Sequence, residues 1–117
     1  MPNTTSERRS SLRAPVDGLA NRYLGGYPYL CRLADISPTG MRVTGFLEPK
    51  VPQKYVGVQF ELPGISGVFS ASGEIVFENP TTREVRLRFT KIPPSAASAI
   101  KAFLVSSANQ QELCSSS

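Results

Sequence analysis

Three arginines lie close together near the start of the chain, at Arg8, Arg9 and Arg13. The planar guanidinium of arginine can hold phosphate oxygens in two-point contacts, and it can pair in the same way with O6 and N7 of a guanine. A short basic run is more commonly a solvated segment with no ligand. From these residues alone, an anionic ligand and a solvated basic segment both remain open.

A second group of polar residues follows at fixed spacing, Asp35-x-Ser37-x-x-Gly40. The sequence Ser37-Pro38 and Gly40 interrupt an apolar alternation, so we expect residues 35–40 to form the tight connection of a hairpin with both side chains projecting from it. Asp35 could accept two hydrogen bonds from N1–H and N2–H₂ of a guanine. Ser37 could offer a hydroxyl to a phosphate oxygen, and Gly40 would let backbone N–H groups approach closely. Capping of the turn is the commoner role of such residues.

Taken together, the two groups are chemically complementary to a guanine dinucleotide, although their chemistry does not say which one. Further arginines are expected on outward strand positions and could border the same face, but they are more often ordinary solvated residues. These are Arg42, Arg86 and Arg88.

The rest of the chain supplies short strands that would position these groups. Six stretches of alternating apolar residues are separated by turn signals, which favours an antiparallel barrel or sandwich. They cover residues 14–19, 27–33, 41–44, 56–62, 69–77 and 85–89. Pro15 predicts a distorted start to the first strand, residues 21–26 read as a turn, and Gly73 is expected at a bulge or a close contact. The aromatic residues, including Tyr27, fall mostly on inward positions.

A single helix is predicted after the strands. Ser95 is a plausible N-cap, and Ala97, Ile100, Phe103 and Leu104 share one face of a helix expected to end around Ser106. The fold class is therefore all-β with a C-terminal α-helix. We expect residues 1–7 to be a flexible N-terminal arm and residues 106–117 a flexible polar tail.

Composition excludes several classes of function. The 117 residues suit one domain, and 13 Lys and Arg against 9 Asp and Glu give a net charge of +4, which favours an anionic ligand or partner. There is no histidine, and Cys31 and Cys114 lie far apart, so we expect no metal site, no catalytic residue and no enzyme. Cys31 falls in a strand pattern and should be a core residue, whereas Cys114 should be exposed. No secretory signal and no run of 18 apolar residues is visible, which predicts a cytoplasmic protein without membrane insertion.

The two polar groups, in this order and ahead of a series of strands, resemble the signature of the PilZ family. That signature is RxxxR followed by [D/N]xSxxG, present here as Arg9-xxx-Arg13 and Asp35-x-Ser37-xx-Gly40. The resemblance runs from about residue 7 to about residue 105. It implies a six-stranded antiparallel barrel with a C-terminal helix over residues 8–105, and a receptor for the bacterial second messenger cyclic di-GMP. The ligand-binding residues that it implies are Arg8, Arg9, Arg13, Asp35, Ser37 and Gly40.

The resemblance also implies how such a receptor would act. An arginine directly before the first signature arginine, here Arg8, goes with two intercalated cyclic di-GMP molecules per chain. The N-terminal segment would fold over the barrel when the ligand binds, and an unidentified effector protein would read the change and control motility, pili or exopolysaccharide in biofilms. The alternative is a PilZ-fold adaptor that binds proteins without the nucleotide. A small basic barrel for single-stranded nucleic acid is disfavoured because the aromatic residues are expected to face inward, so we expect no DNA or RNA partner.

Overall fold

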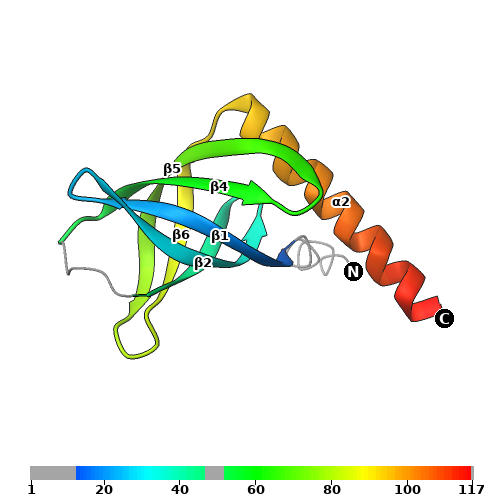
Figure 1. Cartoon of the computed structure of the whole chain (residues 1–117), viewed down its shortest axis with the longest axis horizontal. Helices are drawn as coiled ribbons and strands as arrows, with labels where there is room; N and C mark the ends of the chain where they lie inside the picture. Colours follow the sequence, from blue (N-terminus) through cyan, green and yellow to red (C-terminus); the bar gives the residue numbers. More distant parts are fainter. Residues whose placement is uncertain (1–12, 47–51, 117) are drawn as a thin grey trace, which may run out of the picture.

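The computed structural model describes residues 13–46 and 52–116, with side chains described as far as residue 108. Six antiparallel strands close into a barrel in the order β1-β2-β3-β6-β5-β4, and one helix follows them (Figure 1). The elements are β1 (Ala14–Leu24), β2 (Tyr27–Ser37), β3 (Gly40–Gly45), β4 (Tyr55–Leu62), β5 (Ile65–Asn79), β6 (Glu84–Lys91) and α2 (Pro94–Ser116). The predicted fold class is confirmed.

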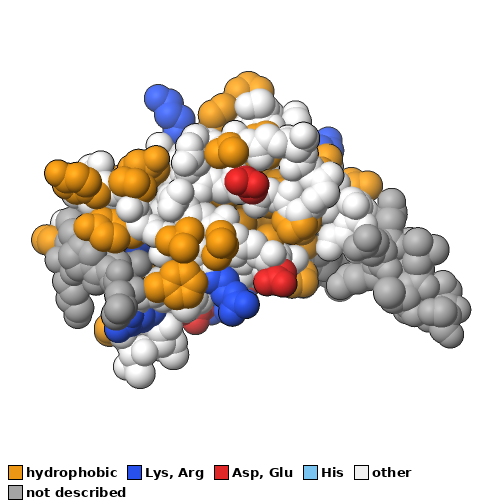
Figure 2. All heavy atoms as spheres, in the orientation of Figure 1, with side chains coloured by type: hydrophobic (Ala, Val, Ile, Leu, Met, Phe, Trp, Pro, Cys, Tyr) orange, Lys and Arg blue, Asp and Glu red, His pale blue; other side chains and the backbone are white. Residues whose placement is uncertain are grey.

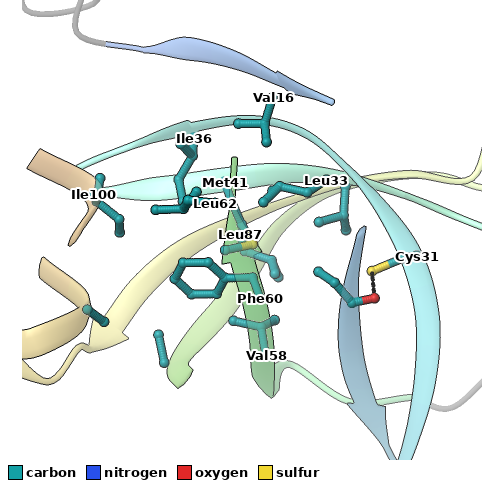
Figure 3. Packing of buried hydrophobic residues seen from close by; sticks show 14 of the residues in the cluster. Val16, Cys31, Leu33, Ile36, Met41, Val58, Phe60, Leu62, Leu87 and Ile100 are labelled. Atoms are coloured by element: carbon teal, nitrogen blue, oxygen red, sulfur yellow. Dashed lines mark hydrogen bonds between the residues drawn. The ribbon is translucent and has the colours of Figure 1, made fainter. Parts of the chain in front are cut away.

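The inside of the barrel is filled by the apolar half of each alternating strand. In β4, for example, Val56, Val58, Phe60 and Leu62 are all buried, because every second side chain of a strand points to the same face. Figure 3 shows Phe60 and Leu33 within this core, together with Cys31, whose thiol donates to the Ala20 carbonyl oxygen at 3.5 Å. The prediction that Cys31 is a core residue is confirmed.

The first strand is longer than the sequence pattern suggested. A register shift between Pro15 and Gly18 gives β1 the irregular start predicted from Pro15. The turn predicted over residues 21–26 is wrong, because β1 continues to Leu24 and only Gly25 and Gly26, both with positive φ, form the turn. The apolar alternation of β1 could not be recognised beyond residue 20, because the inward position 22 holds a charged residue. This residue, Arg22, is only 2% exposed.

Two irregularities in β5 change which side chains face inward. The register with β6 shifts between Ser72 and Gly73, and a Cβ on Gly73 would lie 3.0 Å from the Arg88 carbonyl oxygen, which confirms the predicted close contact. A second shift between Ile75 and Phe77 places Phe77 opposite Arg86, where it is exposed. Phe77, at the end of the alternating stretch 69–77, therefore lies outside the core.

Tyr27 is also exposed, at 69%, although it lies in the alternating pattern of β2. It stands next to the Gly25–Gly26 turn and pairs with Leu24, which is buried. The aromatic residues of the described chain are thus not confined to the core.

The helix packs on the barrel through a short apolar stripe. Ala96, Ala99, Ile100 and Phe103 are buried, whereas Ala97, predicted on this face, is exposed. The helix begins at Pro94, one residue before the predicted N-cap Ser95. It extends past the barrel to Ser116, well beyond the predicted end near Ser106 (Figure 1). The apolar stripe ends near Leu104, but residues 105–112 contain neither Gly nor Pro to stop the helix. No helix in the described part of the chain is long and apolar enough to cross a membrane.

Candidate functional site

The hairpin of β2 and β3 is joined by a two-residue turn at Pro38 and Thr39. Ser37 pairs with Gly40, and Asp35 pairs with Arg42. Asp35 and Ser37 therefore lie within β2, and the prediction that both project from the turn is wrong. The strand pairing continues to the last residue before Pro38, so the connection is shorter than the interrupted alternation suggested.

The Ser37 hydroxyl stabilises this turn by hydrogen bonds. Its Oγ accepts hydrogen bonds from the backbone N–H groups of Thr39 at 3.3 Å and Gly40 at 3.2 Å. The same hydroxyl lies 3.3 Å from the Gly40 carbonyl oxygen and 3.2 Å from Thr39 Oγ1. Because Ser37 is also buried, a phosphate would have to compete with these internal partners for its hydroxyl proton.

Gly40 is required by the contact between β3 and β6. A Cβ at this position would lie 2.1 Å from the carbonyl oxygen of Leu87, far inside any normal contact. Only glycine lets the two backbones approach this closely. The packing of the barrel thus explains Gly40 without reference to a ligand.

Asp35 is held by two arginines, one on each carboxylate oxygen. Arg13 Nη1 donates to Oδ1 at 3.0 Å, and Arg42 Nε donates to Oδ2 at 2.7 Å. The Asp35 side chain is only 10% exposed, whereas those of Arg13 and Arg42 are 47% and 37% exposed. The hydrogen bond to Asp35 raises the pKa of Arg42 above its ordinary value, against a smaller opposing effect of burial. The carboxylate is thus covered mainly by its own cationic partners.

Arg42 extends this contact to a neighbouring strand. Its Nη1 lies 3.7 Å from Glu84 Oε2, and the same oxygen lies 3.2 Å from Arg86 Nε. The guanidinium of Arg86 also sits over the ring of Phe77, 5.0 Å from its centroid. We call Arg13, Asp35, Arg42, Glu84 and Arg86 the arginine–carboxylate network, because these five side chains form one connected set of ion pairs across the outer face of the barrel.

Arg88 belongs to a separate ion-pair group. Its Nη2 donates to Glu74 Oε1, and Lys54 Nζ lies 3.3 Å from Glu74 Oε2. The hydrogen bonds from Arg88 and then Lys54 lower the pKa of Glu74 below its ordinary value of 4.5. Within the described residues, Arg88 therefore pairs across β5 and β6 and does not contact Asp35.

The structure brings together part of the predicted site. Arg13 and Asp35 are in contact, with Ser37 and Gly40 at the end of the same hairpin, whereas Arg8 and Arg9 lie outside the described residues. Sequence reasoning underrated Arg42, which was placed only at the periphery. A signal was available, because a two-residue turn at residues 38 and 39 sets residue 42 directly opposite residue 35.

Metal-ligating side chains do not cluster in the described parts of the chain. No group of three or more His, Cys, Asp or Glu side chains within them could hold a metal ion. The site is therefore best described as a covered carboxylate flanked by guanidinium groups on the outside of a barrel, an arrangement suited to binding.

Comparison with protein-family models gives a match to the PilZ domain over residues 7–106. The chain belongs to the PilZ family. The match includes both arginine and Asp/Ser/Gly segments, so the family suggested by the sequence motifs is confirmed. A search of the curated proteins finds no match.

Solved structures share the fold at low sequence identity. The PilZ domain of Escherichia coli YcgR with c-di-GMP superposes with a TM-score of 0.63 at 14% identity, covering 89% of this chain and 94% of that one. The Bacillus subtilis inhibitor of motility MotI/DgrA gives 0.60 at 15%, covering 85% and 49%. The Borreliella burgdorferi PlzA protein in complex with c-di-GMP gives 0.52 at 17%, covering 92% and 50%. This PilZ chain spans about half the length of MotI/DgrA and of PlzA.

Replacing Gly40 tests whether the contact of β3 with β6 limits the stability of the barrel. We expect Gly40→Ala to lower the free energy of unfolding by about 3 kcal/mol or more, because the new methyl group meets backbone that cannot move aside cheaply. Gly57→Ala is the matched control, since its Cβ would meet nothing nearer than the Tyr23 ring at 3.9 Å. Urea unfolding of both variants measures the difference. Equal stability of the two would show that β3 and β6 can separate at little cost.

The Arg88–Glu74 pair gives a pH-dependent prediction. Because the folded-state pKa of Glu74 is lowered, its contribution to stability is present above pH 4.5 and is lost as pH falls through the folded-state value. In Arg88→Gln we expect the Glu74 pKa to rise towards its ordinary value, with a shallower loss of stability on acidification. NMR titration of the Glu74 carboxyl measures the pKa. An unchanged value in the variant would contradict this assignment.

Proposed function

We propose that this PilZ chain is a receptor for cyclic di-GMP that transmits the level of the ligand to a partner protein. The observation that carries the proposal is the Asp35 carboxylate, held on the outer face of a PilZ barrel by Arg13 and Arg42. It is a binding role without catalysis, and we propose that it operates in the cytoplasm, where such a messenger is made and read.

The two arginines leave lone pairs of Asp35 available for a guanine. A carboxylate has about four lone-pair sites, and each arginine takes one. The remaining sites can accept N1–H and N2–H₂ of a guanine side by side. Each arginine has further N–H groups, beyond the one on Asp35, that could serve phosphate oxygens or O6 and N7 of a base. A dinucleotide with two guanines and two phosphates matches both demands.

The structural neighbours support the choice of ligand and the kind of output. The YcgR domain and PlzA were solved with c-di-GMP, and MotI/DgrA is described as an inhibitor of motility. These structures resemble this chain in fold at low sequence identity. We therefore propose the ligand from the site residues and the family together. Motility, pilus function or exopolysaccharide synthesis in biofilms is the output we propose for the effector.

Single-stranded nucleic acid is a weaker candidate, although its exclusion cannot rest on the aromatic residues. Tyr27, Phe46, Tyr55 and Phe77 are all exposed, although the aromatic residues were expected to fall mostly on inward positions. In the described parts of the face in Figure 2, however, Lys and Arg are scattered among apolar and uncharged side chains and form no continuous stripe. A backbone-tracking groove for nucleic acid needs such a stripe, which this face does not present. An oligonucleotide is a control ligand in the binding experiment.

Calorimetric titration with cyclic di-GMP tests the receptor function, with GTP, cyclic di-AMP and an oligonucleotide as controls. We expect selective binding, and a loss of about a hundredfold or more in Arg9→Ala and Arg13→Ala, because two-point hydrogen bonds between charged groups are lost. Arg32→Ala is the matched control, since Arg32 lies on β2 and is 3.8 Å from Asp17, away from Asp35. Absence of binding to the unaltered protein would reject the receptor function in favour of the nucleotide-independent adaptor.

The number of ligands per chain provides a separate prediction. We propose two cyclic di-GMP molecules, with Arg8 stacking on a base or pairing with a phosphate of the second one. In Arg8→Ala the calorimetric stoichiometry should fall from two towards one, with weaker overall binding. If the variant still binds two ligands, Arg8 is not what determines the number.

A further inference from the structure

The two arginines on Asp35 are held in different ways. Arg42 lies within β3, directly opposite Asp35, makes the shorter bond at 2.7 Å and also reaches Glu84. Arg13 precedes β1, makes the longer bond at 3.0 Å and is the more exposed of the two. Arg42 is therefore the fixed partner of the carboxylate, and Arg13 is the one a ligand can displace more easily.

Fixing the carboxylate matters because the terminal torsion of an aspartate is broad. The Arg42 guanidinium has an anionic partner on two sides: its Nε donates to Asp35 at 2.7 Å, and its Nη1 forms a looser ion pair with Glu84 at 3.7 Å. A planar group with partners on two sides does not rotate freely, so the direction of its N–H bond to Oδ2 is restrained. That bond restrains the terminal torsion of Asp35, and with it the direction of the lone pairs not used by arginine, at the oxygen that Arg13 does not contact.

We infer that Arg42 is a positioning residue that gives the site its specificity for guanine. By orienting Asp35, it directs the remaining lone pairs of the carboxylate towards N1–H and N2–H₂ of the base. Arg42 itself need not touch the ligand. The inference rests on the proposed binding of cyclic di-GMP. It assigns to a strand residue outside the RxxxR and [D/N]xSxxG signatures the task of orienting the carboxylate that recognises the 2-amino group.

The test compares two ligands on each variant: cyclic di-GMP and cyclic di-inosine monophosphate, which lacks both 2-amino groups. In the unaltered protein, removing the amino groups should weaken binding by about tenfold or more, because a hydrogen bond to a charged acceptor is lost. In Arg42→Gln this ratio should fall to about twofold or less. Arg42→Lys keeps the charge but not the planar two-point contact, and its ratio should fall as well.

Arg32→Gln is the matched control, since it removes the same charge from β2 at a residue that contacts Asp17 and not Asp35. It should keep the full ratio. Thermal unfolding verifies that each variant is folded, and if Arg42→Gln fails to fold, Arg42→Lys provides the same comparison.

Two results would overturn the inference while leaving the receptor function in place. If Arg42→Gln weakens both ligands equally, Arg42 supplies only charge or stability. If Arg42→Lys keeps the full ratio, charge alone suffices and orientation is not the cause. Failure of the unaltered protein to bind cyclic di-GMP is a distinct outcome, which rejects the proposed function and this inference with it.

Discussion

The approach of β3 to β6 at Gly40 is the constraint from which the site follows. The Leu87 carbonyl oxygen occupies the space that a side chain would need, and Phe89 N–H donates to the Thr39 carbonyl oxygen at 2.7 Å. These contacts set the register of β3 with β6, while the two-residue turn sets its register with β2. As a result Asp35, Arg42 and Arg86 stand side by side in one row across three strands. The row of charges is thus a product of barrel closure.

A small contribution of this row to stability is consistent with the binding role proposed for it. Exposed ion pairs such as Arg86–Glu84 contribute little to folding, and a covered carboxylate costs desolvation that its partners only offset. Stability comes from the apolar core, which includes Phe60, Leu33 and Ile100. An arrangement that adds little to stability yet holds Asp35 at both oxygens is suited to presenting that carboxylate in one orientation.

The sequence was informative where local rules govern the structure. The alternation of apolar residues predicted the strands. The motifs that contain Arg13, Asp35 and Gly40 indicated the family. It was less informative where the register shifts. The irregularities between Leu33 and Asp35 and between Ile75 and Phe77 cannot be seen in an alternating pattern, because each depends on the partner strand.

Two further differences arise where the apolar pattern of the sequence does not report what determines the structure. Arg22 is buried although nothing in its local sequence sets it apart from the exposed arginines, and only closure of the barrel around it decides its environment. The helix continues beyond its last buried residue because residues can be helical without packing on the barrel. The apolar stripe in the sequence indicates only where the helix packs, and not where it ends.

The place of Arg13 makes ligand binding and the chain before β1 interdependent under the proposed function. Asp35 is shared between Arg42, which is fixed in the barrel, and Arg13, where that preceding chain joins it. A guanine that approaches the carboxylate must either be accommodated beside Arg13 or displace it, and both change the energy of the Arg13–Asp35 contact. By linkage, an effector that binds the same segment changes the affinity for the ligand by the factor with which the ligand changes the affinity for the effector. One ion pair is therefore sufficient to connect ligand occupancy with recognition by a partner.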